Sequence, residues 1–131
     1  MSSEVVIVAV AERALMQLTL AFRGTPYHVT AVEPVRLLRT AKRLAGRHPA
    51  AMVVSLDGSE NVADIRALLS TSPATRFVFL APEMPPRAAL SRIVKDSGAA
   101  IMSAAEAPIV IVATTIALLS DRPSPTPGEI A

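Results

Sequence analysis

Five short apolar runs, rich in valine, isoleucine and phenylalanine, recur along the chain and are typical of buried β-strands. The run from Ala50 to Gly58 is the central one, because two adjacent valines lead into a carboxylate, Asp57, at its end. The run at 27–32 is more polar and suits the edge of a sheet. The predicted strands are Val5–Val10, Tyr27–Val32, Ala50–Asp57, Phe77–Ala81 and Ala99–Ser103.

Between these runs the apolar residues recur at helical spacing. Leu15, Leu18 and Phe22 fall at positions i, i+3 and i+7 of a segment that stops at Gly24. A second helix begins at Glu33-Pro34 and ends at Gly46, and Ser59 is a candidate cap for a third. The predicted helices are 11–23, 33–45, 59–71, 86–97 and 106–120.

Strands that alternate with helices predict an α/β fold with a doubly wound parallel sheet and helices on both faces. In such folds ligands bind at the carboxyl ends of the central strands. The residues that follow Val10, Ala81 and Ser103, together with Asp57, are therefore the candidates for a functional site. We expect one domain at 1–120, followed by a proline-rich segment, 121–131, that is a disordered tail or a linker.

Composition excludes several classes of function. Aromatic residues make up only 3% of the chain, which leaves few rings for stacking on nucleic-acid bases. The formal net charge of +2 predicts no partner by bulk electrostatics. The chain has no cysteine, His28 and His48 are isolated, and no glycine motif follows the first strand. We therefore expect neither an enzyme nor a bound cofactor.

The hydrophobic runs are short. None approaches the roughly 20 residues that span a bilayer, and the first residues lack the basic segment of a signal peptide. We expect a cytoplasmic protein without a membrane partner.

Three segments carry a resemblance to a known family. HPAAMVVSLDG (48–58) resembles the third strand of the receiver domain of bacterial two-component response regulators, which ends in the phosphoacceptor aspartate. ATRFVFLAP (74–82) resembles the fourth strand with its exit loop, and KDSGAAIMSA (95–104) resembles the approach to the fifth. The resemblance covers Val5 to Leu119 and implies a flavodoxin-like five-stranded sheet with strand order 2-1-3-4-5.

The resemblance also implies a set of functional positions. Receivers hold Mg²⁺ with the phosphoacceptor and an acidic pair at the end of the first strand, because Mg²⁺ requires oxygen ligands. They place Thr or Ser after the fourth strand and Lys after the fifth. The matching residues here are Val10 and Ala11, Ala81, and Ala104 or Ala105. Four of the five positions are thus apolar, and we expect a degenerate receiver, or pseudo-receiver, that has lost metal-dependent phosphorylation.

Two interpretations of the remaining carboxylates stay open. Asp57 is either a vestigial, turn-forming residue or a phosphoacceptor that uses an unusual Mg²⁺ site. Glu12, one position later than the family's acidic pair, either serves as a substitute metal ligand or begins the first helix, where an acid is favoured.

Two surfaces are candidates for partner binding. Arg36, Arg39, Arg43 and Arg47 form a basic stripe on the second predicted helix, which is either a solvated face or a contact for an acidic partner or a nucleic-acid backbone. The last helix has no charge between Glu106 and Asp121.

On the last helix, Ile109, Val112, Ile116 and Leu119 form the stripe expected to face the sheet. A second stripe, Ile111, Thr115 and Leu118, is expected to point elsewhere and to form a protein interface, in a homodimer. We therefore expect a signalling domain that acts on a protein partner, with phosphorylation of Asp57 or nucleic-acid binding as the alternatives.

Overall fold

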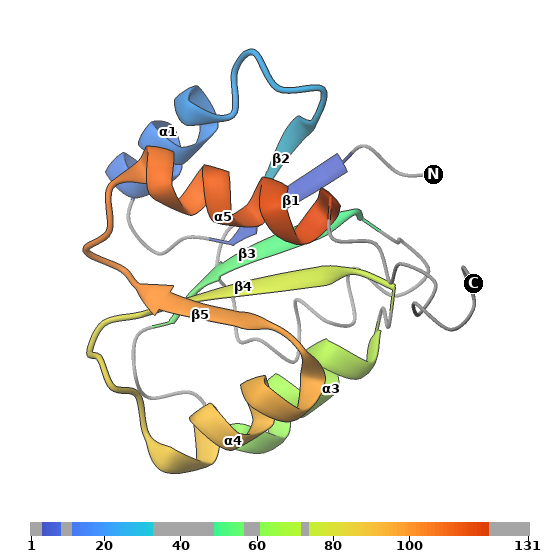
Figure 1. Ribbon diagram of the computed structural model, residues 1–131, viewed down its shortest axis with the longest axis vertical. Helices are drawn as coiled ribbons and strands as arrows, with labels where there is room; N and C mark the ends of the chain where they lie inside the picture. The colour runs from blue at the N-terminus through green and yellow to red at the C-terminus, as the bar shows by residue number, and fades with distance from the viewer. Residues whose placement is uncertain (1–3, 9–11, 33–48, 57–60, 72–73, 121–131) are drawn as a thin grey trace, which may run out of the picture.

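The computed structural model describes residues 4–8, 12–32, 49–56, 61–71 and 74–120. Within these residues, five parallel strands form one sheet in the order β2-β1-β3-β4-β5 (Figure 1). The strands are β1 (Glu4–Val8), β2 (His28–Val32), β3 (Ala51–Ser55), β4 (Arg76–Ala81) and β5 (Ala100–Ser103), and the helices are α1 (Glu12–Ala21), α3 (Val62–Thr71), α4 (Ala88–Ser97) and α5 (Pro108–Ser120). The predicted fold class and strand order are confirmed. The helix predicted at 33–45 and the segment 121–131 lie outside the described residues.

The sheet separates two hydrophobic cores, because successive side chains of a strand point to opposite faces. On β1, Val5 and Ile7 belong to the core beneath α1 and α5, whereas Val6 and Val8 belong to the core beneath α3 and α4. Figure 1 shows these two helical layers on either side of the sheet. Both faces of the central strands are therefore buried, which explains why their sequences are continuous apolar runs rather than alternating ones.

The two cores are filled differently. Phe77 and Phe79 lie two residues apart on β4, so both point to the α3 and α4 side, with ring centroids 6.0 Å apart. On the other side, Phe22, directly after α1, is the largest fully buried side chain. The three phenylalanines thus occupy the interior, and mainly aliphatic side chains fill the remaining volume.

The beginnings of α3 and α4 differ from the prediction. The side-chain oxygen of Asn61 accepts a hydrogen bond of 2.8 Å from the backbone N–H of Ala63, so Asn61 caps α3. The predicted cap, Ser59, lies outside the described residues. Helix α4 begins at Ala88, after Arg87 in an extended conformation, so Pro86 precedes the helix instead of lying in its first turn.

The orientation predicted for the last helix is wrong at three positions, Ile109, Ile111 and Thr115. Ile111 and Thr115 are buried at 3% and 0% exposure, and Ile109, expected to face the sheet, is exposed. The Thr115 hydroxyl donates a 2.8 Å hydrogen bond to the Ile111 carbonyl, which satisfies it inside the core. Leu118 is partly buried against the same core. Ile111 and Thr115 therefore cannot face a partner.

The cause of this error is the composition of α5. Twelve of its thirteen residues are apolar or threonine, so the periodicity carries little information about which side meets the sheet. The predicted burial is correct for Val112, and Ile116 and Leu119 pack partly against the core. In the described part of the chain, no helix has the length and apolar character needed to cross a membrane.

Replacing Asn61 with Ala is expected to lower the free energy of unfolding by about 1 kcal/mol, because the N–H of Ala63 loses its acceptor. Asn61→Asp keeps an acceptor oxygen at the same position and should retain most of the stability. Urea unfolding followed by circular dichroism measures both. Equal losses in the two variants would contradict the assigned cap.

Ile111→Asp is expected to lower the free energy of unfolding by about 3–5 kcal/mol, because it leaves an unpaired charge in the core. Ala117→Asp places the same charge at an exposed position of the same helix and should change stability by less than about 1 kcal/mol. Urea unfolding at a dilute protein concentration compares them. A well-folded Ile111→Asp variant would show that α5 is turned the other way.

Candidate functional site

The carboxyl edge of the sheet is held together by backbone hydrogen bonds that continue past the strands. The N–H of Leu56, just after β3, donates to the carbonyl of Leu80 at 2.9 Å. The N–H of Ala104, just after β5, donates to the carbonyl of Ala81 at 2.8 Å. The residue before Asp57, the end of β4 and the end of β5 are therefore fixed next to one another, at the edge where α/β sheets place ligands.

The side chains at this edge are small and mostly apolar. Ala81, the last residue of β4, is 2% exposed and presents only a methyl group. Ala104 and Ala105 follow β5 and are exposed, so neither position offers an ammonium group. The fold thus brings Ala81, Ala104 and Ala105 to one edge of the sheet, as the predicted parallel strands require.

Ser103 is the polar side chain that ends β5. Its hydroxyl accepts a 3.1 Å hydrogen bond from the N–H of Ala105, and its carbonyl accepts one of 3.1 Å from the N–H of Glu106. These contacts shape the turn between β5 and α5. The hydroxyl group of Ser103 is therefore already hydrogen-bonded to the backbone of this turn. That contact accounts for a serine at this position, and no bound ligand is needed to explain it.

The carboxylates predicted to form a site are only partly described. Glu12 is the first residue of α1, so its predicted place at the beginning of a helix is confirmed. Asp57, Val10 and Ala11 lie outside the described residues, and the roles of Glu12 and Asp57 in metal binding stay predictions. Among the described residues, no group of three His, Cys, Asp or Glu side chains is close enough to hold a metal ion.

The donor set at the ends of β4 and β5 does not fit Mg²⁺. Ala81 supplies no oxygen ligand from its side chain, and the Ser103 hydroxyl is a neutral group bonded to the chain itself. Magnesium in proteins is held through carboxylates. Asp57 lies outside the described residues, so a role for it or for Glu12 in holding a metal stays a prediction. The basic stripe of Arg36, Arg39, Arg43 and Arg47 also lies outside the described residues.

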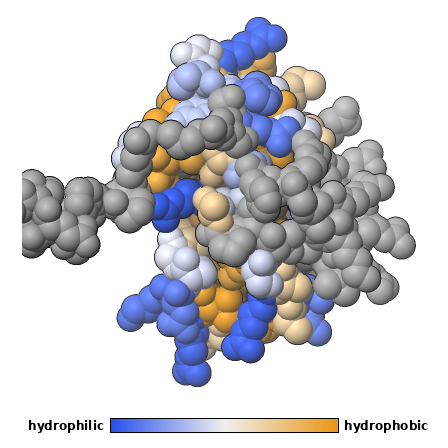
Figure 2. Space-filling model, turned by 90° about the vertical axis from the view of Figure 1, so that its right-hand side faces the viewer, coloured by the Kyte–Doolittle hydropathy of each residue, from blue (hydrophilic) through white to orange (hydrophobic). Residues whose placement is uncertain are grey.

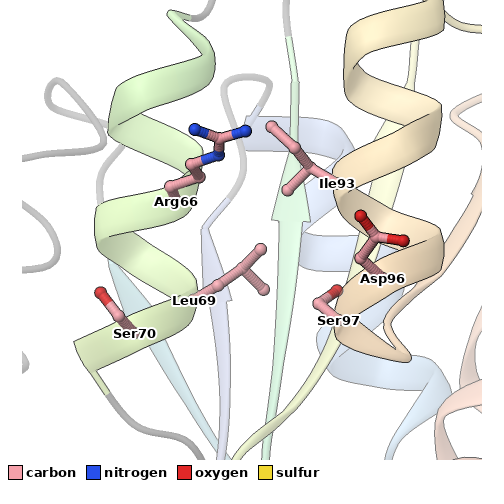
Figure 3. Close-up of a pocket in the computed structure, with 6 residues that line it drawn as sticks. All are labelled: Arg66, Leu69, Ser70, Ile93, Asp96 and Ser97. Atoms are coloured by element: carbon pink, nitrogen blue, oxygen red, sulfur yellow. The ribbon is translucent and has the colours of Figure 1, made fainter.

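A surface groove between α3 and α4 was not predicted from the sequence. It has a volume of about 340 Å³, and Figure 3 shows side chains from the two helices facing each other across it. Leu69 and Ile93 form an apolar floor, and exposed Arg66 and Asp96 lie on opposite sides. In the space-filling view the layer of α3 and α4 shows apolar side chains between hydrophilic ones (Figure 2). The lining residues are Arg66, Leu69, Ser70, Ile93, Asp96 and Ser97.

The spacing of the residues that line the groove is visible in the sequence, because each helix contributes residues at positions i, i+3 and i+4. That spacing identifies one face of each helix but does not say that the two faces meet. The charges of Arg66 and Asp96 on its rim are exposed to water, so they contribute little to the stability of the fold.

Several solved structures share this architecture. A response regulator from Thermotoga maritima has a TM-score of 0.72 and 14% sequence identity, covering 92% of this chain and 100% of that chain. The isolated REC domain of RcsB from Salmonella enterica serovar Typhimurium has a TM-score of 0.72 and 16% identity, covering 93% and 91%. A pilus assembly protein CpaE from Caulobacter crescentus CB15 has a TM-score of 0.67 and 15% identity, covering 88% and 92%.

No protein-family model matches the chain, and no curated protein sequence matches it either. At the identities of the solved structures, the similarity establishes the fold. The chain has the fold of response-regulator receiver domains.

Proposed function

We propose that this chain is a degenerate receiver domain that acts in signalling through protein contacts and has lost metal-dependent phosphorylation of Asp57. The observation that carries the proposal is an alanine, Ala81, with its methyl group buried at the end of β4. The fold brings this residue to the edge where a receiver needs a hydroxyl group.

Phosphorylation of a carboxylate gathers negative charge that must be offset by cations and hydrogen-bond donors. At this edge the side chains of Ala81, Ala104 and Ala105 supply neither. The sequence places Val10 and Ala11 where two carboxylates would bind Mg²⁺. Three separate parts of the phosphorylation machinery are therefore replaced by apolar side chains, which favours loss of the whole reaction over adjustment of one step.

Glu12 does not restore the metal site by its position alone. It is the first residue of α1, where a carboxylate is stabilised by the partial positive charge of the helix N-terminus. This local role accounts for an acid at that position. The alternative, in which Glu12 and Asp57 together bind Mg²⁺ and support phosphorylation, is the outcome that the first experiment below would detect.

One observation, the similarity to the CpaE pilus assembly protein, favours a second candidate function, a role in pilus assembly. The receiver fold is thus found both in response regulators and in a pilus assembly protein. A domain that keeps the fold without phosphorylation chemistry would suit an assembly, where binding rather than a covalent switch is needed.

Incubation with acetyl phosphate and Mg²⁺ is expected to leave the intact mass of the protein unchanged, because the edge lacks the groups that stabilise the phosphoryl oxygens. Asp57→Asn is the matched control, since it keeps the size of the side chain and removes the acceptor. A phosphoryl adduct in the native chain that is absent from Asp57→Asn would overturn the proposal. Loss of this phosphoryl adduct in the Glu12→Gln variant would then identify Glu12 as the substitute metal ligand.

Deletion of the coding gene in the source organism distinguishes a role in signalling from a role in pilus assembly. If the chain takes part in pilus assembly, surface pili counted by electron microscopy should be lost and should return on complementation with either the native gene or the Asp57→Asn variant. An unchanged number of surface pili would exclude the role in pilus assembly and leave the role in signalling.

A further inference from the structure

The groove between α3 and α4 lies at the amino edge of the sheet. Four of the six residues that line it belong to the last turns of these helices. Each helix runs back across the parallel sheet, so it ends at the edge where the strands begin. Helix α5 ends at the same edge, at Ser120 (Figure 1). The chain therefore leaves α5 on the side of the molecule where the groove lies.

The groove combines an apolar floor with two charges of opposite sign. Leu69 and Ile93 form the floor, and Arg66 and Asp96 extend from the two helices on either side of it (Figure 3). Within the described part of the chain, neither Arg66 nor Asp96 makes an ion pair. Asp96 lies in the last turn of α4, where the partial negative charge of the helix C-terminus disfavours a carboxylate. A cation from a bound segment would offset that charge.

The segment that follows α5, residues 121–131, has the sequence DRPSPTPGEIA and carries matching groups. It contains one large aliphatic side chain, Ile130, with an acid, Glu129, beside it and a base, Arg122, near its start. Its three prolines favour an extended conformation, which lowers the entropy lost when the segment is ordered on a surface. The segment thus offers an apolar group for the floor of the groove and one charge of each sign for its rim.

We propose that residues 121–131 bind in the groove between α3 and α4 of the same chain. Ile130 packs on the apolar floor, Glu129 pairs with Arg66, and Arg122 lies toward the C-terminal ends of the two helices. The proposal is independent of the proposed function, because it concerns the amino edge of the sheet and not the carboxyl edge. It leaves contacts with a protein partner to other surfaces of the domain.

The length of the segment is sufficient to reach the groove. Helix α5 and the pair α3 and α4 cover opposite faces of the sheet, so the two helical layers are about 20 Å apart. Ile130 lies ten residues after Ser120, a span of about 31 Å in an extended polyproline conformation. Because both partners belong to one molecule, their effective concentration is on the order of millimolar, and a weak contact is sufficient.

Paramagnetic relaxation measured by NMR tests the proposal on the full chain. The chain has no cysteine, so Ala131→Cys accepts a single nitroxide label next to Ile130. The amide signals of Ser70 and Ser97, which line the groove, are expected to lose most of their intensity relative to the reduced label. Unchanged intensity at both residues would overturn the proposal.

The outer surface of α1 is a control for unspecific apolar contact. Met16 and Leu20 are 59% and 51% exposed there, on the opposite face of the sheet from the groove, and their amide signals should keep their intensity. A loss centred on these two residues would contradict binding in the groove. Loss at the groove in a mixture of isotope-labelled chains and separate spin-labelled chains would show binding between molecules, and would equally exclude the proposal.

Exchange of the paired charges tests the predicted contact between Glu129 and Arg66. In the spin-labelled chain, Arg66→Glu should reduce the loss of signal at the groove several-fold, because two carboxylates then repel each other. Adding Glu129→Arg restores an opposite pair and should recover the loss. Arg13→Glu makes the same change of net charge at an exposed position of α1 and should have little effect. Equal effects of Arg66→Glu and Arg13→Glu, or no recovery in the double variant, would refute the pairing.

Discussion

The structure depends on burial of both faces of the strands β1, β3 and β4. Their side chains are apolar in both directions, so the sheet is stable in water only when helices cover each side. This requirement fixes α1 and α5 on one face and α3 and α4 on the other, and it brings the carboxyl ends of the strands to one edge. The positions of Ala81, Ala104 and Ala105 follow from that arrangement rather than from contacts made by their side chains.

Much of this fold could be predicted from the sequence, because a buried strand has a direct signature. Val5 to Val8 and Phe77 to Ala81 are continuous apolar runs, and both are strands in the structure. The ends of elements were less predictable, since they depend on individual hydrogen bonds such as the one that Asn61 accepts. The rotation of α5 was not predictable from periodicity, because a helix that is apolar on nearly all sides contains no clear stripe.

The candidate site could be predicted in one respect and not in another. Comparison with the receiver pattern identified Ala81, Ala104 and Ala105 as the residues at the edge, and the fold brings them together because parallel strands end on the same side. The groove between α3 and α4 was missed, since it arises from two helices whose contact cannot be inferred from either alone. The apolar outer surface of α1 was missed for a related reason. Met16 and Leu20 fit a helical pattern, and a pattern of this kind is normally attributed to the core.

The backbone hydrogen bonds at the carboxyl edge have a consequence for how such a domain can carry information. The N–H groups of Leu56 and Ala104 hold the ends of β3, β4 and β5 next to one another through the main chain alone. A receiver with a phosphoryl group reports on a kinase by changing between two shapes. If phosphorylation of Asp57 is lost, as proposed above, this domain can report only through its abundance, because the fraction of occupied partners then rises and falls with the number of molecules in the cell. Control of such a protein would lie in its synthesis and degradation.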